Sequence, residues 1–247
     1  MRAMHAREVV AEALGTAFLL AAVVGSGIMA ERLSGGNVAL ALLANSIATG
    51  GALIALILTF GPVSGAHFNP VVTLSDAFLG GLKWKKVPGY LAAQLAGAFV
   101  GTGLANSMFD LPVFFASTHA RHGTGQLISE VVATFGLLAV IWGCSRRRNA
   151  SVPFAVAGYI MAAYWFTAST SFANPAVTLA RSASNTFAGI RPLDVPDFIL
   201  AQFVGAILAT LLFKWLTPSL PKNAPDVLMP HNESFNPSPS NQSHNHG

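Results

Sequence analysis

The stretch that decides the fold is SGAHFNPVVT at residues 64–73, together with STSFANPAVT at residues 169–178. Each contains an Asn-Pro pair, Asn69-Pro70 or Asn174-Pro175, at the start of an apolar run too short to cross a membrane. Asparagine is a favoured N-cap residue and proline suits the first turn of a helix, so a short helix is predicted to begin at each pair. The first short helix is expected to end near Gly80-Gly81.

Six longer apolar segments surround these two short ones. Each is close to the ~20 residues that a membrane-spanning helix needs. The segments are residues 9–30, 38–60, 87–108, 127–144, 152–168 and 196–216. The sequence therefore predicts an all-α membrane protein with six transmembrane helices and two re-entrant half-helices.

Composition supports lipid as the solvent of this chain. Its 247 residues are 53% hydrophobic and 10% charged, whereas soluble domains carry ~25% charged residues. The basic residues stand in small groups between apolar runs, which does not suggest a nucleic-acid partner. A single cysteine, Cys144, excludes a disulfide framework and a multi-thiolate metal site.

The chain repeats itself, with similar short motifs in its first and second halves. Glu12 in the first half corresponds to Glu130 in the second, and the Asn69 motif corresponds to the Asn174 motif. A third set of pairs also recurs in the same order: Val87-Pro88, Ala93-Gln94 and Gly97-Ala98 in the first half, and Val195-Pro196, Ala201-Gln202 and Gly205-Ala206 in the second. Each half has three crossings, which is an odd number, so the second half is inverted relative to the first. This pattern is typical of inverted repeats with discontinuous helices at the midplane.

The repeats define the domain organisation. We expect a cytoplasmic N-terminus at residues 1–8, a channel domain at 9–216 with repeats at about 9–108 and 127–216, and a disordered cytoplasmic tail at 217–247. Ten basic residues fall on one side of the predicted bundle and four on the other; the positive-inside rule then makes both termini cytoplasmic. The first apolar run also suits a signal peptide, but Glu12 interrupts it and its pattern recurs at Glu130.

The two half-helices define a pore. They enter from opposite faces, and their N-termini meet near the centre, each with unpaired N–H groups and about half a positive charge. A cation meets a barrier there, whereas a neutral hydroxylated solute can accept hydrogen bonds, including from the Asn69 and Asn174 amides. The irregular backbone at 64–68 and 169–173 supplies carbonyl acceptors along a wet cavity.

These two motifs closely resemble the twin signatures of the aquaporin, or major intrinsic protein, family, over about residues 8 to 216. The resemblance implies a right-handed bundle that assembles as a homotetramer, with one pore per subunit, no cofactor and no enzymatic activity. It implies a pore midplane at Asn69, Pro70, Val71, Asn174, Pro175 and Ala176. It implies that Glu12 and Glu130 accept hydrogen bonds from the pore loops, the alternative being a proton relay. His67 would donate in the cytoplasmic vestibule, and it has no second ligand in view for a metal.

The sequence departs from the family pattern at the expected selectivity filter. Val71 stands where alanine is usual, Val177 stands where water- and glycerol-selective members carry an arginine, and Thr178 replaces a glycerol-channel aspartate. Counting from the two motifs assigns the filter to four small uncharged residues, Thr49, Ala162, Ser171 and Val177. Arg181, one turn beyond Val177, is either a cation in the outer vestibule or a surface arginine at a helix C-terminus.

The functional hypothesis is a passive channel with a wide, arginine-free filter, in a bacterial cytoplasmic (inner) membrane. Candidate solutes are glycerol and other polyols, urea-like molecules, water, and undissociated metalloid acids such as arsenite or methylated arsenicals. The filter resembles that of divergent bacterial members associated with arsenic resistance. The alternatives are an ordinary water channel, a pore-closed structural member, or a secondary active transporter, which would need an ion-coupling cluster. No nucleophile with a base is visible, so an intramembrane enzyme is not expected.

Overall fold

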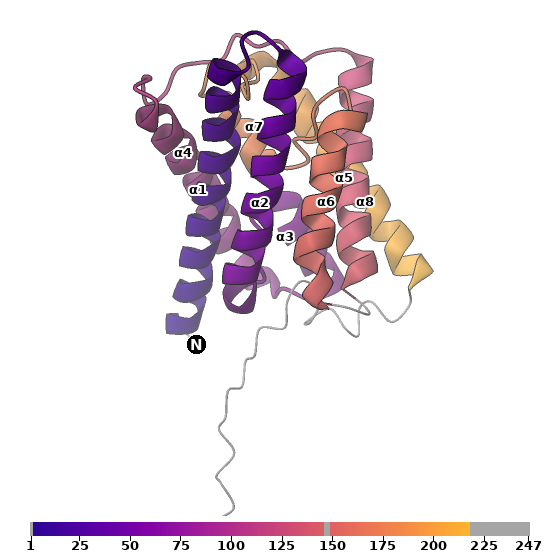
Figure 1. Ribbon diagram of the computed structural model, residues 1–247. Coiled ribbons are helices and arrows are strands. Elements are labelled where there is room, and N and C mark those ends of the chain that lie inside the picture. Colours follow the sequence, from indigo (N-terminus) through magenta and orange to yellow (C-terminus); the bar gives the residue numbers. More distant parts are fainter. Residues whose placement is uncertain (1, 146–148, 218–247) are drawn as a thin grey trace, which may run out of the picture.

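The computed structural model describes residues 2–145 and 149–217. Residues 146–148 and the tail from 218, assigned above to the cytoplasmic side, lie outside the described part. Two half-helices, α3 (Pro70–Leu79) and α7 (Pro175–Arg181), lie inside a bundle of longer helices (Figure 1). The longer helices are α1 (Arg2–Leu33), α2 (Val38–Ser64), α4 (Val87–Met108), α5 (Thr124–Cys144), α6 (Val152–Phe166) and α8 (Val195–Leu216), and the short 3-10 turns are η1 (Trp84–Lys86), η2 (Asn149–Ser151) and η3 (Pro192–Asp194). The predicted all-α fold is confirmed for the described residues.

The inverted repeat is visible in the packing. Helix α1 packs on α4 and α2, and α5 packs on α8 and α6 in the same way, while α2 against α6 joins the two halves. In Figure 1 α3 lies in the lower half of the bundle and α7 in the upper half. The chain's N-terminus and the C-terminal end of α8 both lie at the lower end.

Glycines allow the outer helices of each repeat to approach closely. A Cβ on Gly97 of α4 would lie 2.2 Å from the carbonyl oxygen of Ala13 in α1, and one on Gly101 would lie 2.0 Å from that of Ala17. The second repeat has an equivalent close contact at a glycine, since a Cβ on Gly205 of α8 would lie 2.4 Å from the Val131 carbonyl oxygen of α5. Small residues of this kind are characteristic of helix contacts within membranes.

Four stretches of the described chain are long and apolar enough to cross a membrane, namely His5–Leu33, Val38–Ser64, Thr124–Cys144 and Pro192–Leu216. Helix α4 is as long as α8 but less apolar, and α6 has 15 residues. The half-helix α3 has 10 residues, whereas α7 has 7. Helix α3 ends at Gly80 in the left-handed conformation, while α7 ends at Ser182 without a glycine.

Candidate functional site

Two irregular loops lead into the half-helices, and both hold an unusual backbone. Five residues other than glycine have positive φ there: Ala66 and Phe68 before α3, and Thr170, Ser171 and Ala173 before α7. This region of backbone space is unfavourable for residues with a Cβ and persists where surrounding contacts enforce it. The loops therefore depend on partners elsewhere in the bundle.

Glu12 of α1 is the partner of the first loop. Its carboxylate accepts hydrogen bonds from the backbone N–H groups of His67 (2.9 Å) and Phe68 (2.8 Å). It also accepts from the Ser64 hydroxyl at 2.6 Å and from Gln94 Nε2 of α4 at 2.7 Å. Glu12 therefore satisfies the backbone N–H groups of two loop residues from another helix.

Glu130 of α5 does the same for the second loop. It accepts from the N–H groups of Phe172 and Ala173, both at 2.9 Å, and from Gln202 Nε2 at 2.6 Å. Gln202 also donates to Thr178 Oγ1 at 2.8 Å, as Gln94 does to Thr73 Oγ1. The two glutamines were not assigned a role from the sequence, although the Ala-Gln pair recurs in the repeat.

The two asparagines cap their own helices and reach across to the opposite loop. Asn69 Oδ1 accepts from Val71 N, and its Nδ2 donates to the Ala173 carbonyl at 2.8 Å. Asn174 Oδ1 accepts from Ala176 N, and its Nδ2 donates to the Phe68 carbonyl at 2.8 Å. Each amide nitrogen carries two hydrogens, so one remains for a solute at the centre.

A cavity of about 80 Å³ lies along these loops inside the bundle. A volume of about 10–15 Å³ is enough to hold one water molecule. Seven of the predicted site residues line it: Thr49, His67, Asn69, Ser171, Asn174, Val177 and Arg181. Pro70, Val71, Pro175 and Ala176 are buried near the junction of the half-helices and are not among the lining residues, and Glu12 and Glu130 lie fully buried behind the loops.

The structure corrects one member of the predicted filter. Ala162 is exposed on the outer surface of α6 and does not line the cavity. Tyr164, two residues further on, lines it instead, and its hydroxyl lies 3.2 Å from Thr49 Oγ1. The prediction that this filter has no aromatic side chain is therefore wrong. Val177 and Ser171 lie in the same lining, and Ser171 Oγ is buried without a partner in the described chain.

Arg181 is buried, with 2% of its surface exposed, so it is not a surface arginine at a helix end. Its Nε donates to the Ala188 carbonyl, and its guanidinium carbon lies 3.4 Å from the centre of the Phe172 ring. Within the described chain, the two terminal nitrogens of Arg181 have no hydrogen-bond partner, and Arg181 lines the cavity. A guanidinium therefore faces the solute path one turn beyond Val177.

A second buried arginine, which was assigned no role from the sequence, stabilises this end of the cavity. Arg121, from the segment between α4 and α5, donates from Nε to the Gly189 carbonyl (2.8 Å) and from Nη1 to the Ser169 carbonyl (3.2 Å). Its guanidinium carbon lies 4.9 Å from the Phe172 ring centre. Burial lowers the pKa of Arg121 to about 10, so it remains charged at neutral pH. A lone arginine in a connecting segment gives no signal of this role.

The other end of the cavity carries a His67–Asp76 pair in place of the Phe172–Arg181 pair. His67 occupies the place in the first repeat that Phe172 occupies in the second, and Asp76 corresponds in the same way to Arg181. His67 Nε2 lies 3.5 Å from Asp76 Oδ2, and Nδ1 lies 3.1 Å from Thr73 Oγ1. Both side chains are nearly buried, and His67 lines the cavity. The repeat therefore preserves the contact between these two positions but with different side chains.

Comparison with known proteins agrees with this geometry. The family model for major intrinsic proteins matches residues 1–157 and 145–242. The chain belongs to the major intrinsic protein family. As a member of that family it is a multi-pass membrane channel protein and not an enzyme.

Individual relatives fall within the same family. The chain is 56% identical over 210 residues to "Aquaglyceroporin AqpS" of Rhizobium meliloti, covering 85% of this chain and 90% of the relative. It is 28% identical over 233 residues to a "Probable glycerol uptake facilitator protein" of Thermotoga maritima, covering 83% and 97%. An X-ray structure of the aquaglyceroporin from Plasmodium falciparum matches with a TM-score of 0.69 and 24% identity, over 87% of this chain and 98% of that one, which shows the shared fold.

Proposed function

We propose that this major intrinsic protein is a passive channel for small uncharged solutes larger than water, with polyols such as glycerol as the leading class. The observation that carries the proposal is Val177, an uncharged side chain lining the cavity beside Thr49 and Ser171. The 56% identity to a protein named as an aquaglyceroporin supports the same class. Pore selectivity depends on diameter, lining donors and acceptors, and electrostatic barriers.

The lining offers the hydrogen bonds that a hydroxylated solute needs. Asn69 and Asn174 supply N–H donors at the centre, and the loop carbonyls and the unpartnered Ser171 hydroxyl supply acceptors. Undissociated metalloid acids, including arsenite and methylated arsenicals, present the same neutral hydroxyl groups and belong to the proposed range. An ordinary water channel is the alternative, and the Tyr164 ring in the lining is the feature that favours it.

Active transport is disfavoured by the state of the intramembrane glutamates. A secondary transporter would need acidic groups free to bind a coupling ion near the midplane. The carboxylates of Glu12 and Glu130 instead accept hydrogen bonds from loop N–H groups and from a glutamine each. This supports a structural role for both residues.

Arg181 is assigned the electrostatic part of the outer barrier. A guanidinium near the path repels cations, and its terminal nitrogens offer donors to neutral oxygens. Its position one turn from Val177 separates the charge from the size filter. His67 and Asp76 form the corresponding vestibule group at the opposite end.

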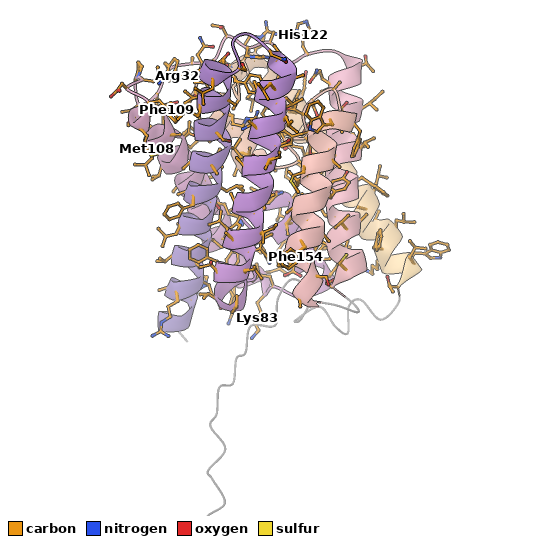
Figure 2. All side chains as sticks on the ribbon, viewed as in Figure 1. Arg32, Lys83, Met108, Phe109, His122 and Phe154 are labelled. Atoms are coloured by element: carbon orange, nitrogen blue, oxygen red, sulfur yellow. The ribbon has the colours of Figure 1, made fainter. Side chains whose placement is uncertain are left out.

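The proposed setting is the cytoplasmic (inner) membrane of a bacterium, in contact with lipid and as a homotetramer. Both termini are assigned to the cytoplasm because Lys83 marks the end of the bundle where the N-terminus lies, while Arg32 marks the other end (Figure 2). Lys85, Lys86 and Lys214 add to the basic residues on the side of Lys83. No cofactor and no nucleic acid is assigned to the function.

The test replaces Val177 by arginine in proteoliposomes. Glycerol uptake is expected to fall at least about tenfold, because a long cation fills the opening, while water permeability falls much less. Val177→Leu is the matched control, because it adds bulk without charge and should retain more glycerol uptake than Val177→Arg. Stopped-flow swelling with water, glycerol and larger polyols gives the size series, and metalloid uptake is measured alongside. Unchanged glycerol uptake in Val177→Arg would remove Val177 from the constriction and reject the proposed filter.

A further inference from the structure

A second groove lies on the outside of the bundle, between α3, α8 and η1. Its volume is about 320 Å³, far above the 10–15 Å³ or so that holds a water molecule. Its lining is almost wholly apolar, and Phe78, Trp84, Ile207 and Leu211 of the lining are exposed at its rim. In a membrane protein such a face meets hydrocarbon, so a groove of this size suits an acyl chain.

A buried hydroxyl group of the groove lining lacks a hydrogen-bond partner in the described chain. Thr210 of α8 lines the groove with 4% of its surface exposed, and its Oγ1 is buried with no hydrogen-bond partner in the described chain. Threonine in a helix commonly donates to the carbonyl four residues earlier. Thr59 and Thr167 do so here, at 2.7 and 2.6 Å. In the described chain this hydroxyl is enclosed, as are the unpartnered hydroxyls of Thr16, Thr102 and Thr134, and a rotation about χ1 would turn it toward an acceptor in the groove.

A cation stands at the end of the same face of α8. Lys214 is four residues beyond Thr210, so the two lie about 6 Å apart along the helix axis. Its ammonium nitrogen lies 5.0 Å from the centre of the Phe78 ring, which belongs to the groove lining. Among the described residues, Lys214 has no carboxylate within ion-pair distance. Lys83 lies at this end of the bundle as well (Figure 2).

We propose that this groove is a binding site for an anionic glycerophospholipid. One acyl chain occupies the apolar lining along Leu74, Phe78 and Ile207. The phosphate contacts Lys214, and the Thr210 hydroxyl donates to an ester carbonyl of the same lipid. Thr210 and Lys214 are one helical turn apart, which suits the ester and phosphate groups because these are neighbours in the lipid. Along the groove, the apolar lining, the Thr210 hydroxyl and the Lys214 ammonium therefore occur in the same order as the acyl chain, the ester and the headgroup of the lipid.

Other occupants fit these observations less well. A polyol would leave its hydroxyl groups unsatisfied against an apolar lining, which is costly. A zwitterionic lipid gains less from Lys214 and the neighbouring lysines than an anionic one, because a lysine near the surface favours negative lipid charge. A second copy of the chain would cover the groove without bringing a phosphate to Lys214.

Filling the groove is the first test. The purified protein is equilibrated with phosphatidylglycerol or phosphatidylcholine, and retained lipid is counted by native mass spectrometry. Ile207→Trp and Leu208→Trp are a matched pair, since both parent residues are exposed on α8 but only Ile207 lines the groove. Retained phosphatidylglycerol is expected to fall severalfold in Ile207→Trp and to stay at the parent level in Leu208→Trp.

Removing the charge is the second test. Lys214→Gln is expected to lower the ratio of phosphatidylglycerol to phosphatidylcholine by about fivefold, the usual effect of one lysine on anionic lipid. Arg7→Gln also removes one positive charge at an exposed site on the same side, but on α1, which does not line the groove, and should leave the ratio near that of the parent. Added inorganic phosphate should not displace the lipid, because the acyl chain contributes to binding.

The Thr210 hydroxyl is tested by a change of nearly equal volume. Thr210→Val should raise the melting temperature of the delipidated protein, because an unpaired buried hydroxyl is removed. Added phosphatidylglycerol should then raise the melting temperature of this variant by less than it raises that of the parent. Equal retention by the parent and Ile207→Trp would overturn the site. So would displacement by inorganic phosphate alone, or a changed number of subunits in Ile207→Trp with lipid retention unchanged, which would assign the groove to a second copy.

Discussion

At the residue scale, the two ends of the cavity differ in charge although the backbone that carries them repeats. Arg181 stacks on Phe172 at one end, and Asp76 faces His67 at the equivalent place of the other repeat. At an effective dielectric constant of 20, a cation about 4 Å from a guanidinium is repelled by about 4 kcal/mol. The half-helix dipoles and Arg181 thus act on a cation at different points along its path.

The Arg181→Gln variant tests whether the charge of Arg181 adds to the barrier that cations meet in the pore. Cation conductance in voltage-clamped membranes should rise at least about tenfold, because lowering the energy barrier by about 1.4 kcal/mol increases the rate of crossing it about tenfold. Glycerol uptake should change little, since Val177 is unaltered. Arg32→Gln is the control, because Arg32 lies at the same end but is exposed. Parent-level conductance in Arg181→Gln would contradict the electrostatic role.

The limits of prediction from sequence also appear at this scale. The Asn-Pro caps depend only on residues that are adjacent in the sequence, and both short helices begin where the caps predict them. Ala162 was assigned by counting back twelve residues from Asn174, but α6 ends at Phe166 and the chain is irregular from there to Asn174. Helical phase is lost across such a segment, and an error of two residues turns a side chain by about 200° on a helix. Tyr164 therefore lines the cavity in place of Ala162.

At the scale of elements, each irregular loop is held by one carboxylate from another helix. The Glu12→Ala variant leaves the N–H groups of His67 and Phe68 without an acceptor, at about 1–3 kcal/mol each. Glu12→Gln keeps one acceptor oxygen and should lower the melting temperature less. Glu31→Ala, at an exposed position of the same helix, should leave it nearly unchanged.

The same variants distinguish structural support from proton coupling. Thermal unfolding in detergent gives the stability, and solute uptake across a pH series gives the coupling. If Glu12→Ala were as stable as the parent while its uptake lost a pH dependence that the parent shows, the structural role would be rejected in favour of a proton-coupled mechanism.

The contact between α1 and α4 gives a second element-scale prediction. Gly97→Ala places a Cβ 2.2 Å from a backbone oxygen of α1, so the helices must separate and the melting temperature should fall by several degrees. Gly51→Ala is the matched control in α2, where a Cβ meets nothing within 4 Å. Alanine favours a helix over glycine by about 1 kcal/mol, so that variant should be unchanged or more stable. Equal melting temperatures would show that the close approach is unimportant.

At the scale of the whole molecule, the order of the elements and the inverted repeat were predictable because apolar length and capping are properties of short stretches. The network behind the loops was not, since nothing in the sequence says that Gln94 and Gln202 meet Glu12 and Glu130. Such contacts join residues 72 to 82 positions apart. They depend on the packed bundle, and the repeat shows only that both halves have the same residues.

The proposed orientation predicts which side of the membrane each exposed site faces. In a Cys144→Ser background, Glu31→Cys should react with an impermeant maleimide added outside intact cells, whereas Lys85→Cys should react only after the membrane is opened. Both parent residues are exposed, at the end of α1 and in η1 respectively. The reverse pattern of labelling would invert the orientation. Native mass spectra of the parent report assembly, and a homotetramer predicts about four times 25.7 kDa.

The crossed asparagine bonds also impose an order on biosynthesis. Asn69 donates to the carbonyl of Ala173, which is 104 residues later in the chain. A ribosome adding about 5–20 residues per second needs roughly 5–20 seconds to make that stretch. Throughout this interval the nascent first half has a polar loop whose final counterpart has not yet been synthesised. The crossed bonds at the centre of the pore can therefore form only after the second loop has been synthesised.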